Sequence, residues 1–110
     1  MEYRRYEDLE EDLKEEQQKR DNVVKAVSAV LSGEEFVEEK ELNGVSFTKT
    51  YETDDTICHC QFYLDTEANE YSSYVTSEEG GNKVTSFSQS GHIFDAEESV
   101  TDFVDFVHTL

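Results

Sequence analysis

The hydrophobic pattern of the first third of the chain has the period of a helix. Residues 1–32 are rich in Glu, Lys, Gln, Arg and Ala, and Gly33 is placed to follow the last turn. Apolar residues recur at a spacing of seven, although Glu16 and Arg20 interrupt this seam. The apolar stripe is weak in the first half and strong in the second half, VVKAVSAVL. The pattern predicts one long helix over residues 1–32, with its second half packed on the rest of the chain.

After Gly33 the period of the pattern changes to two, which indicates strands. Short polar turns separate five such segments, and Asn43-Gly44 is the strongest signal for a tight hairpin. Strands joined by short turns favour an antiparallel meander, here within residues 34–90. The five segments are residues 33–42, 45–52, 56–64, 70–76 and 83–91.

The last predicted element is a second helix over residues 95–110. Asp95-Ala-Glu-Glu98 has the form of a capping box, in which side chains bond the free amides of the first turn. The apolar positions that follow have helical spacing and form one stripe that should lie on the sheet. These positions are Val100, Phe103, Val104, Phe106, Val107 and Leu110.

Together these elements predict a single α+β domain over residues 1–110. A chain of 110 residues is too short for a second core. The expected architecture is a long N-terminal helix, a five-stranded antiparallel meander and a C-terminal helix packed on one face of the sheet.

Both cysteines lie in the third predicted strand, TICHCQFYL. Alternate side chains share one face of a strand, so Cys58 and Cys60 should point with Phe62 and Leu64, and His59 should point the other way. A zinc site would need further ligands from distant parts of the chain. We therefore expect two buried free thiols in the core, with neither a metal ion nor another cofactor.

No pattern of catalytic residues stands out. The chain has no G-x-S-x-G stretch, and spacing places neither His92 nor His108 beside a nucleophile. Carboxylates are so numerous that no pair of them indicates a glycosidase-like site. The sequence therefore predicts a protein that is not an enzyme and has no catalytic residues.

The net charge restricts the partners of the protein. The chain has 27 Asp and Glu against nine Lys and Arg, a formal net charge of -18. From Thr56 onward the only basic residue is Lys83. Without a basic face the chain should bind neither nucleic acid nor an anionic membrane directly, and no apolar run reaches the about 18 residues of a membrane span. We expect a soluble protein of a reducing compartment, the cytoplasm, which would be that of the host cell if the protein is viral.

The carboxylates are themselves the best candidate for a binding surface. Repulsion among them destabilises the fold, and a basic partner would relieve it. The first hypothesis is therefore a DNA mimic that occupies the nucleic-acid-binding surface of a basic protein. In size and charge the chain resembles phage-encoded inhibitors of restriction or CRISPR systems. The contact residues should be acids at turns and on the final helix: Glu78, Glu79, Glu97, Glu98, Asp102 and Asp105.

A second hypothesis is a head that mediates complex assembly at the end of a coiled coil. The order of elements from NGVSFTKTYETDDTICHCQFYLDTEANEY to FDAEESVTDFVDFVHTL resembles the RWD-type heads of kinetochore and monopolin subunits. That resemblance implies dimerisation, here as a homodimer or with another chain through Tyr6, Leu9 and Leu13 of the first helix. Acidity as an adaptation to high salt, or for solubility alone, is the third interpretation.

Overall fold

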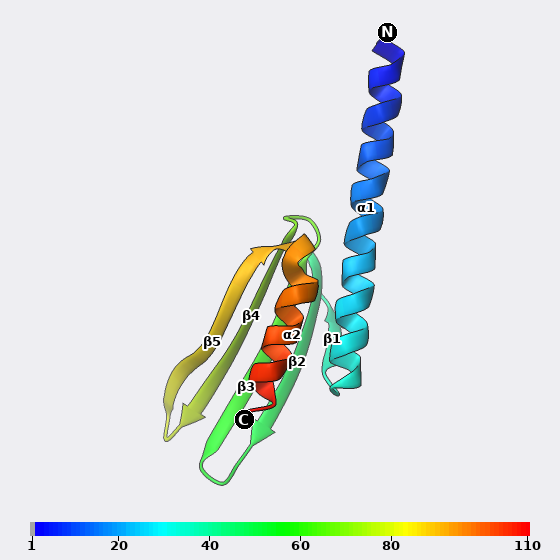
Figure 1. The fold of residues 1–110 in the computed structure, drawn as a ribbon. Coiled ribbons are helices and arrows are strands. Elements are labelled where there is room, and N and C mark those ends of the chain that lie inside the picture. The colour runs from blue at the N-terminus through cyan, green and yellow to red at the C-terminus, as the bar shows by residue number, and fades with distance from the viewer. Residues whose placement is uncertain (1) are drawn as a thin grey trace.

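The computed structural model describes residues 2–110, and for residues 2–10 only the backbone. A long helix, α1 (Glu2–Gly33), precedes five strands, and a short 3₁₀ turn, η1, leads into a closing helix, α2 (Figure 1). The bounds are β1 Val37–Lys40, β2 Gly44–Glu52, β3 Thr56–Asp65, β4 Glu70–Glu79, β5 Asn82–His92, η1 Ile93–Asp95 and α2 Ala96–Val107. The strands pair in the order β1-β2-β3-β4-β5, and every pair is antiparallel. The predicted α+β meander is confirmed.

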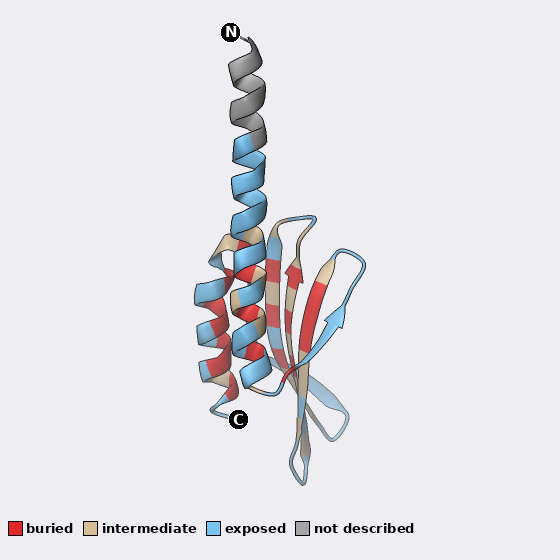
Figure 2. Cartoon of the chain, turned by 90° about the vertical axis from the view of Figure 1, so that its right-hand side faces the viewer, coloured by how far each residue is buried: buried red, intermediate tan, exposed pale blue. Residues whose placement is uncertain are grey.

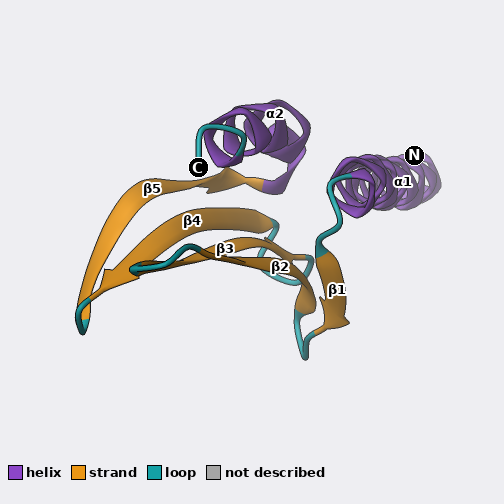
Figure 3. Cartoon of the chain, turned by 90° about the horizontal axis from the view of Figure 1, so that it is seen from below, coloured by secondary structure: helices purple, strands orange, loops and turns teal. Residues whose placement is uncertain are grey.

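Both helices lie on the same side of the sheet (Figure 3). Helix α2 contacts β3, β4 and β5, and α1 contacts α2, η1 and β1. The first half of α1 extends beyond the end of the sheet (Figure 1), so the molecule measures 68 × 25 × 22 Å. The opposite side of the sheet has no helix over it.

The core lies between the two helices and the sheet (Figure 2). An aromatic cluster occupies its centre, where the ring centroid of Phe103 in α2 lies 5.6 Å from that of Phe36 and 5.5 Å from that of Phe62. The ring of Phe87 in β5 lies 5.9 Å from that of Phe103. Burying such a ring stabilises a fold by about 2–3 kcal/mol. Phe103 thus joins the end of α1, the sheet and α2.

Helix α1 does not end as predicted. Gly33 is part of the helix, and the left-handed residue that follows the last turn is Glu35, with φ 67°. The amide of Phe36 donates to the Leu31 carbonyl at 3.0 Å and that of Glu35 to the Ser32 carbonyl at 3.1 Å. These are the two bonds of a Schellman motif, and buried Phe36 and Leu31 supply its hydrophobic contact. The need to bury Phe36 fixes the turn two residues after the glycine.

A tight hairpin turn joins β1 to β2 where the sequence indicates it, and the Glu41 amide donates to the Gly44 carbonyl at 2.9 Å. Its type is not the one that Asn-Gly favours. Neither Asn43 nor Gly44 has the positive φ that a two-residue type I′ turn needs. Gly44 is required for a different reason, because a Cβ atom there would overlap the carbonyl of Leu64. The turn with two positive φ angles is Gly80-Gly81, at 58° and 88°, between β4 and β5.

The capping box predicted for the second helix is wrong. Asp95 is the N-cap of α2, but its side chain makes no capping bond. The chain instead enters α2 through η1, where the Phe94 amide donates to Nδ1 of His92 at 3.2 Å. The helix ends at Val107, so Leu110 lies outside the apolar stripe and is exposed.

Candidate functional site

Helix α2 presents four of the predicted acids on its outer face. Its buried residues face the sheet and α1, and Glu97, Glu98, Asp102 and Asp105 are all exposed. Glu98, Asp102 and Asp105 are spaced i, i+4, i+7, so they lie along one line on the helix surface. At 1.5 Å per residue this line spans about 10 Å.

Because the opposite stripe of α2 is buried in the core, the acidic line belongs to a rigid element. The structure thus brings these four predicted residues together.

The other two predicted acids lie at the end of the sheet, in the β4–β5 hairpin. Glu78 lines a hollow of about 390 Å³ together with three acids of the β2–β3 turn: Glu52, Asp54 and Asp55. Sequence reasoning missed these three. Turn order alone could have found them, since the first and third turns of β2–β5 must lie at the same end of a meander.

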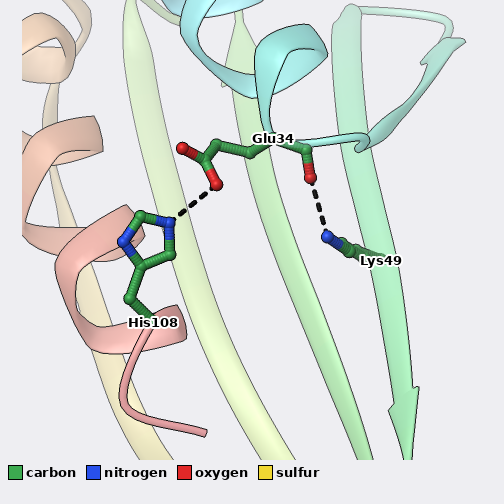
Figure 4. Close-up of polar contacts among 3 residues, drawn as sticks. All are labelled: Glu34, Lys49 and His108. Atoms are coloured by element: carbon green, nitrogen blue, oxygen red, sulfur yellow. Dashed lines mark hydrogen bonds and ion pairs between the residues drawn. The ribbon is translucent and has the colours of Figure 1, made fainter.

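The acids of α2 and those of the β4–β5 hairpin differ in whether a cation lies opposite them. Glu78 pairs in register with Lys83 across the β4–β5 hairpin, so it has a cation opposite it. Between residues 11 and 110 no Lys or Arg forms an ion pair with a carboxylate; the one contact of this kind joins His108 Nε2 to Glu34 Oε2 at 2.7 Å, and it is an ion pair only when the imidazole is protonated. Lys49 Nζ donates to the Glu34 carbonyl at 2.8 Å, so these bonds tie together the ends of α1 and α2 and strand β2 (Figure 4). Within that range the carboxylates of α2 therefore have no cation partner.

The cysteine strand packs as the alternation predicts. Cys58 and Cys60 are buried free thiols, and His59 lies on the other face of β3. Burial, and to a smaller extent the neighbouring Cys58, raise the pKa of Cys60 to about 11. The thiol therefore stays protonated at neutral pH and is a poor nucleophile or metal ligand. In the part of the chain that the structure describes, no three His, Cys, Asp or Glu side chains are grouped to hold a metal ion.

The predicted helix seam can be placed only in part. Tyr6 and Leu9 lie outside the residues whose side chains are described. Leu13 is 63% exposed on the extended half of α1. The first side chains of α1 seen to contact the body are Lys19, whose Nζ lies 4.5 Å from the ring centroid of Phe94, and Arg20, which donates to Asn69 Oδ1 at 3.0 Å.

The uncovered face of the sheet has a different character. A hollow of about 380 Å³ there is lined by residues without a carboxylate, among them Thr48, His59, Gln61 and Tyr74. The Tyr74 hydroxyl donates to Gln61 Oε1 at 2.6 Å. The acids lie on α1, on α2, on β1 and at the turns, and the residues that line this hollow include none of them.

No protein-family model, curated protein or solved structure matches the chain. Among the described residues no helix is both long enough and apolar enough to cross a membrane.

Proposed function

We propose that this protein is a non-enzymatic acidic binding module that occupies the nucleic-acid-binding surface of a basic protein. The observation that supports this most is the exposed acidic line of α2, Glu98, Asp102 and Asp105, which has no cation partner between residues 11 and 110. Like charges held close together on a rigid helix destabilise the free protein. A partner rich in Lys and Arg would relieve that repulsion on binding.

The dimensions of the molecule are consistent with imitation of a nucleic acid. A net charge of -18 along 68 Å corresponds to one charge per about 3.8 Å, roughly half the density of a DNA duplex, which carries one charge per about 1.7 Å. The cross-section of 25 × 22 Å is close to the width of a duplex. A groove that accepts DNA could therefore admit this chain, and the attraction would speed association.

The partner that fits best is an intracellular DNA-binding nuclease. Two buried thiols without a disulfide suit a reducing compartment such as the cytoplasm. A small acidic chain of this kind would act as a viral inhibitor of a restriction or CRISPR nuclease, present in the host cell, and would compete with DNA without touching it. Neither catalytic residues nor a cofactor take part in this function.

The test neutralises the α2 line with near-isosteric amides. The variant Glu98→Gln/Asp102→Asn/Asp105→Asn should bind its partner at least about tenfold more weakly, since each such charge contributes about 0.5 kcal/mol or more. Proteins are captured from host lysate, identified by mass spectrometry, purified and titrated by calorimetry. DNA should displace the wild-type chain from the captured protein, and affinity should fall as salt rises.

The matched control removes three charges elsewhere. Glu11, Asp12 and Glu15 are exposed on the extended half of α1, and their amide variant has the same net charge. It should lose much less affinity than the α2 variant, because it changes the total charge equally but leaves the proposed contact surface on α2 intact. Equal weakening of both variants, or a partner that DNA does not displace, would contradict a DNA-mimic surface on α2.

A second candidate function rests on α1. Leu13 is exposed on a helix that continues past the sheet, as expected for a head tethered through a coiled coil. In this function the head would serve complex assembly, as in RWD-type subunits, and the acids would act in solvation.

A further inference from the structure

The two edges of the sheet are protected very differently. The β1 edge is four residues long, and three of them, Glu38, Glu39 and Lys40, are charged. The β5 edge is eleven residues long, nine of them exposed, with no carboxylate from Gly80 to Phe94. Folded proteins usually shorten an edge or place charges on it, because its free amides and carbonyls can pair with another strand. Only the β1 edge has both of these protections.

The hydrogen-bond alternation shows which backbone groups of β5 are free. The Ile93 amide donates to the Asn69 carbonyl at 2.9 Å, which continues the β4–β5 register by one pair. In an antiparallel ladder every second residue pair is bonded. Ser88, Ser90 and His92 therefore direct their backbone groups away from β4, but the His92 carbonyl, as the N-cap of η1, accepts the first bond of that turn, so only the His92 amide remains free.

A β-bulge interrupts β5 and shortens the segment whose outward backbone groups are regularly spaced for pairing with another strand. Val75 pairs with Phe87 and Thr76 with Thr85, so Ser86 is an extra residue that forms a bulge. The regular part of the edge is therefore Phe87–His92. Helix α2 covers the face of β5 and not its outer edge (Figure 3).

We propose that a second copy of this chain pairs with this segment, β5 to antiparallel β5, to form a ten-stranded sheet. The edge is the place where two molecules of charge -18 can approach without opposing carboxylates, since Phe87–His92 contains only aromatic, hydroxyl, amide, glycine and histidine residues. The free amides and carbonyls of Ser88 and Ser90, with the amide of His92, supply bonds in both directions, as an isologous contact requires.

Pairing of this kind closes on itself. About a twofold axis perpendicular to the sheet, the two β5 edges pair with each other. The two short, charged β1 edges then lie at the ends of the new sheet. Growth beyond the dimer is therefore opposed. The same axis places both α2 helices on one side, so the dimer carries two acidic lines on a single face.

The test is the mass of the full chain by sedimentation equilibrium, from about 10 µM to about 1 mM, at about 20 mM and about 500 mM NaCl, concentrations that span strong and weak screening. The average mass should rise with protein concentration towards twice the 12.7 kDa of one chain. Because the two copies repel, the dimer should be stronger at high salt. A dimer that dissociates as salt rises would instead indicate contact between opposite charges and would overturn the proposal.

The variant Ser90→Pro removes one outward amide and no bond to β4, and edge strands tolerate such a proline. It should be monomeric throughout, with the melting temperature of the wild-type monomer. Ser88→Glu/Ser90→Glu, which places carboxylates on the edge, should give the same loss. Thr50→Glu is the matched control, since Thr50 is exposed on the same face of the sheet but on β2, and it should still dimerise.

Three results would overturn the proposal. The first is a wild type that is monomeric at every concentration, even if a strand of a basic partner binds the β5 edge instead. The second is a dimer that survives both Ser90→Pro and the double Glu variant. The third is a dimer that Leu13→Asp abolishes, which would place the contact on α1.

Discussion

Glu35 is a residue whose backbone conformation conflicts with its side chain. Its φ of 67° lies in the left-handed region, which costs a residue with a Cβ atom about 1 kcal/mol relative to glycine. The Schellman motif holds it there because Phe36 must turn back into the core beside Leu31. The left-handed backbone of Glu35 therefore lowers the stability of the turn that ends α1.

Replacing this residue should stabilise the fold. Glu35→Gly should raise the free energy of unfolding by about 0.5–1 kcal/mol, because the relief of strain exceeds the added entropy of the unfolded chain. Urea denaturation followed by circular dichroism measures this value. Glu35→Gln serves as the control, because it removes the same charge and keeps the Cβ atom. If Gln stabilises as much as Gly, charge and not backbone strain is the cause.

At the scale of elements, α1 consists of two different parts. Val23, Val27 and Leu31 in its second half are buried, but residues 11–19 are all exposed. Helices shorter than about 12–15 residues are marginal without tertiary contacts. Helical structure in the extended half therefore relies on its continuity with the packed half, or on a partner.

Removal of residues 1–17 should leave the body of the protein intact. The free energy of unfolding in urea should change by less than about 0.5 kcal/mol, since the deletion ends before the contacts of Lys19 and Arg20. As a control, Lys19→Ala/Arg20→Ala in the full chain should lower stability measurably. A large loss of stability on truncation would show that the extended half folds onto the body.

Helix α1 also provides the test of the second candidate function, a head tethered through a coiled coil. A coiled-coil tether predicts that Leu13→Asp releases the partner chain and that salt has little effect on that complex. The DNA-mimic function predicts that Leu13→Asp binds the basic partner as the wild type does.

For the whole molecule, stability reflects a competition between an ordinary core and a large like charge. Seventeen hydrophobic residues form one continuous buried cluster. The opposing contribution is a net charge of -18, and between residues 11 and 110 no Lys or Arg forms an ion pair with a carboxylate. Screening therefore weakens far more repulsion than attraction.

The melting temperature should accordingly rise by several degrees between about 10 mM and about 200 mM NaCl, the range in which the Debye length falls from about 30 Å to below 10 Å. Scanning calorimetry of the monomer at low protein concentration measures it. The Glu98→Gln/Asp102→Asn/Asp105→Asn variant should show a smaller rise. A chain that folds only above about molar salt would point to salt adaptation, and a melting temperature that falls with salt would contradict dominant repulsion.

The periodic pattern of apolar residues predicts the elements, their order and the face on which Cys58 and Cys60 lie, and the composition sets the total charge. These follow from the periods of helix and strand, which are local properties of the backbone. Only the docked fold shows that Glu35 and not Gly33 is left-handed and that Gly44 is needed against Leu64. It also decided that the long strand left at an edge is the one without carboxylates. Each of these depends on how elements far apart in the chain dock, a result of many weak contacts that no local pattern records.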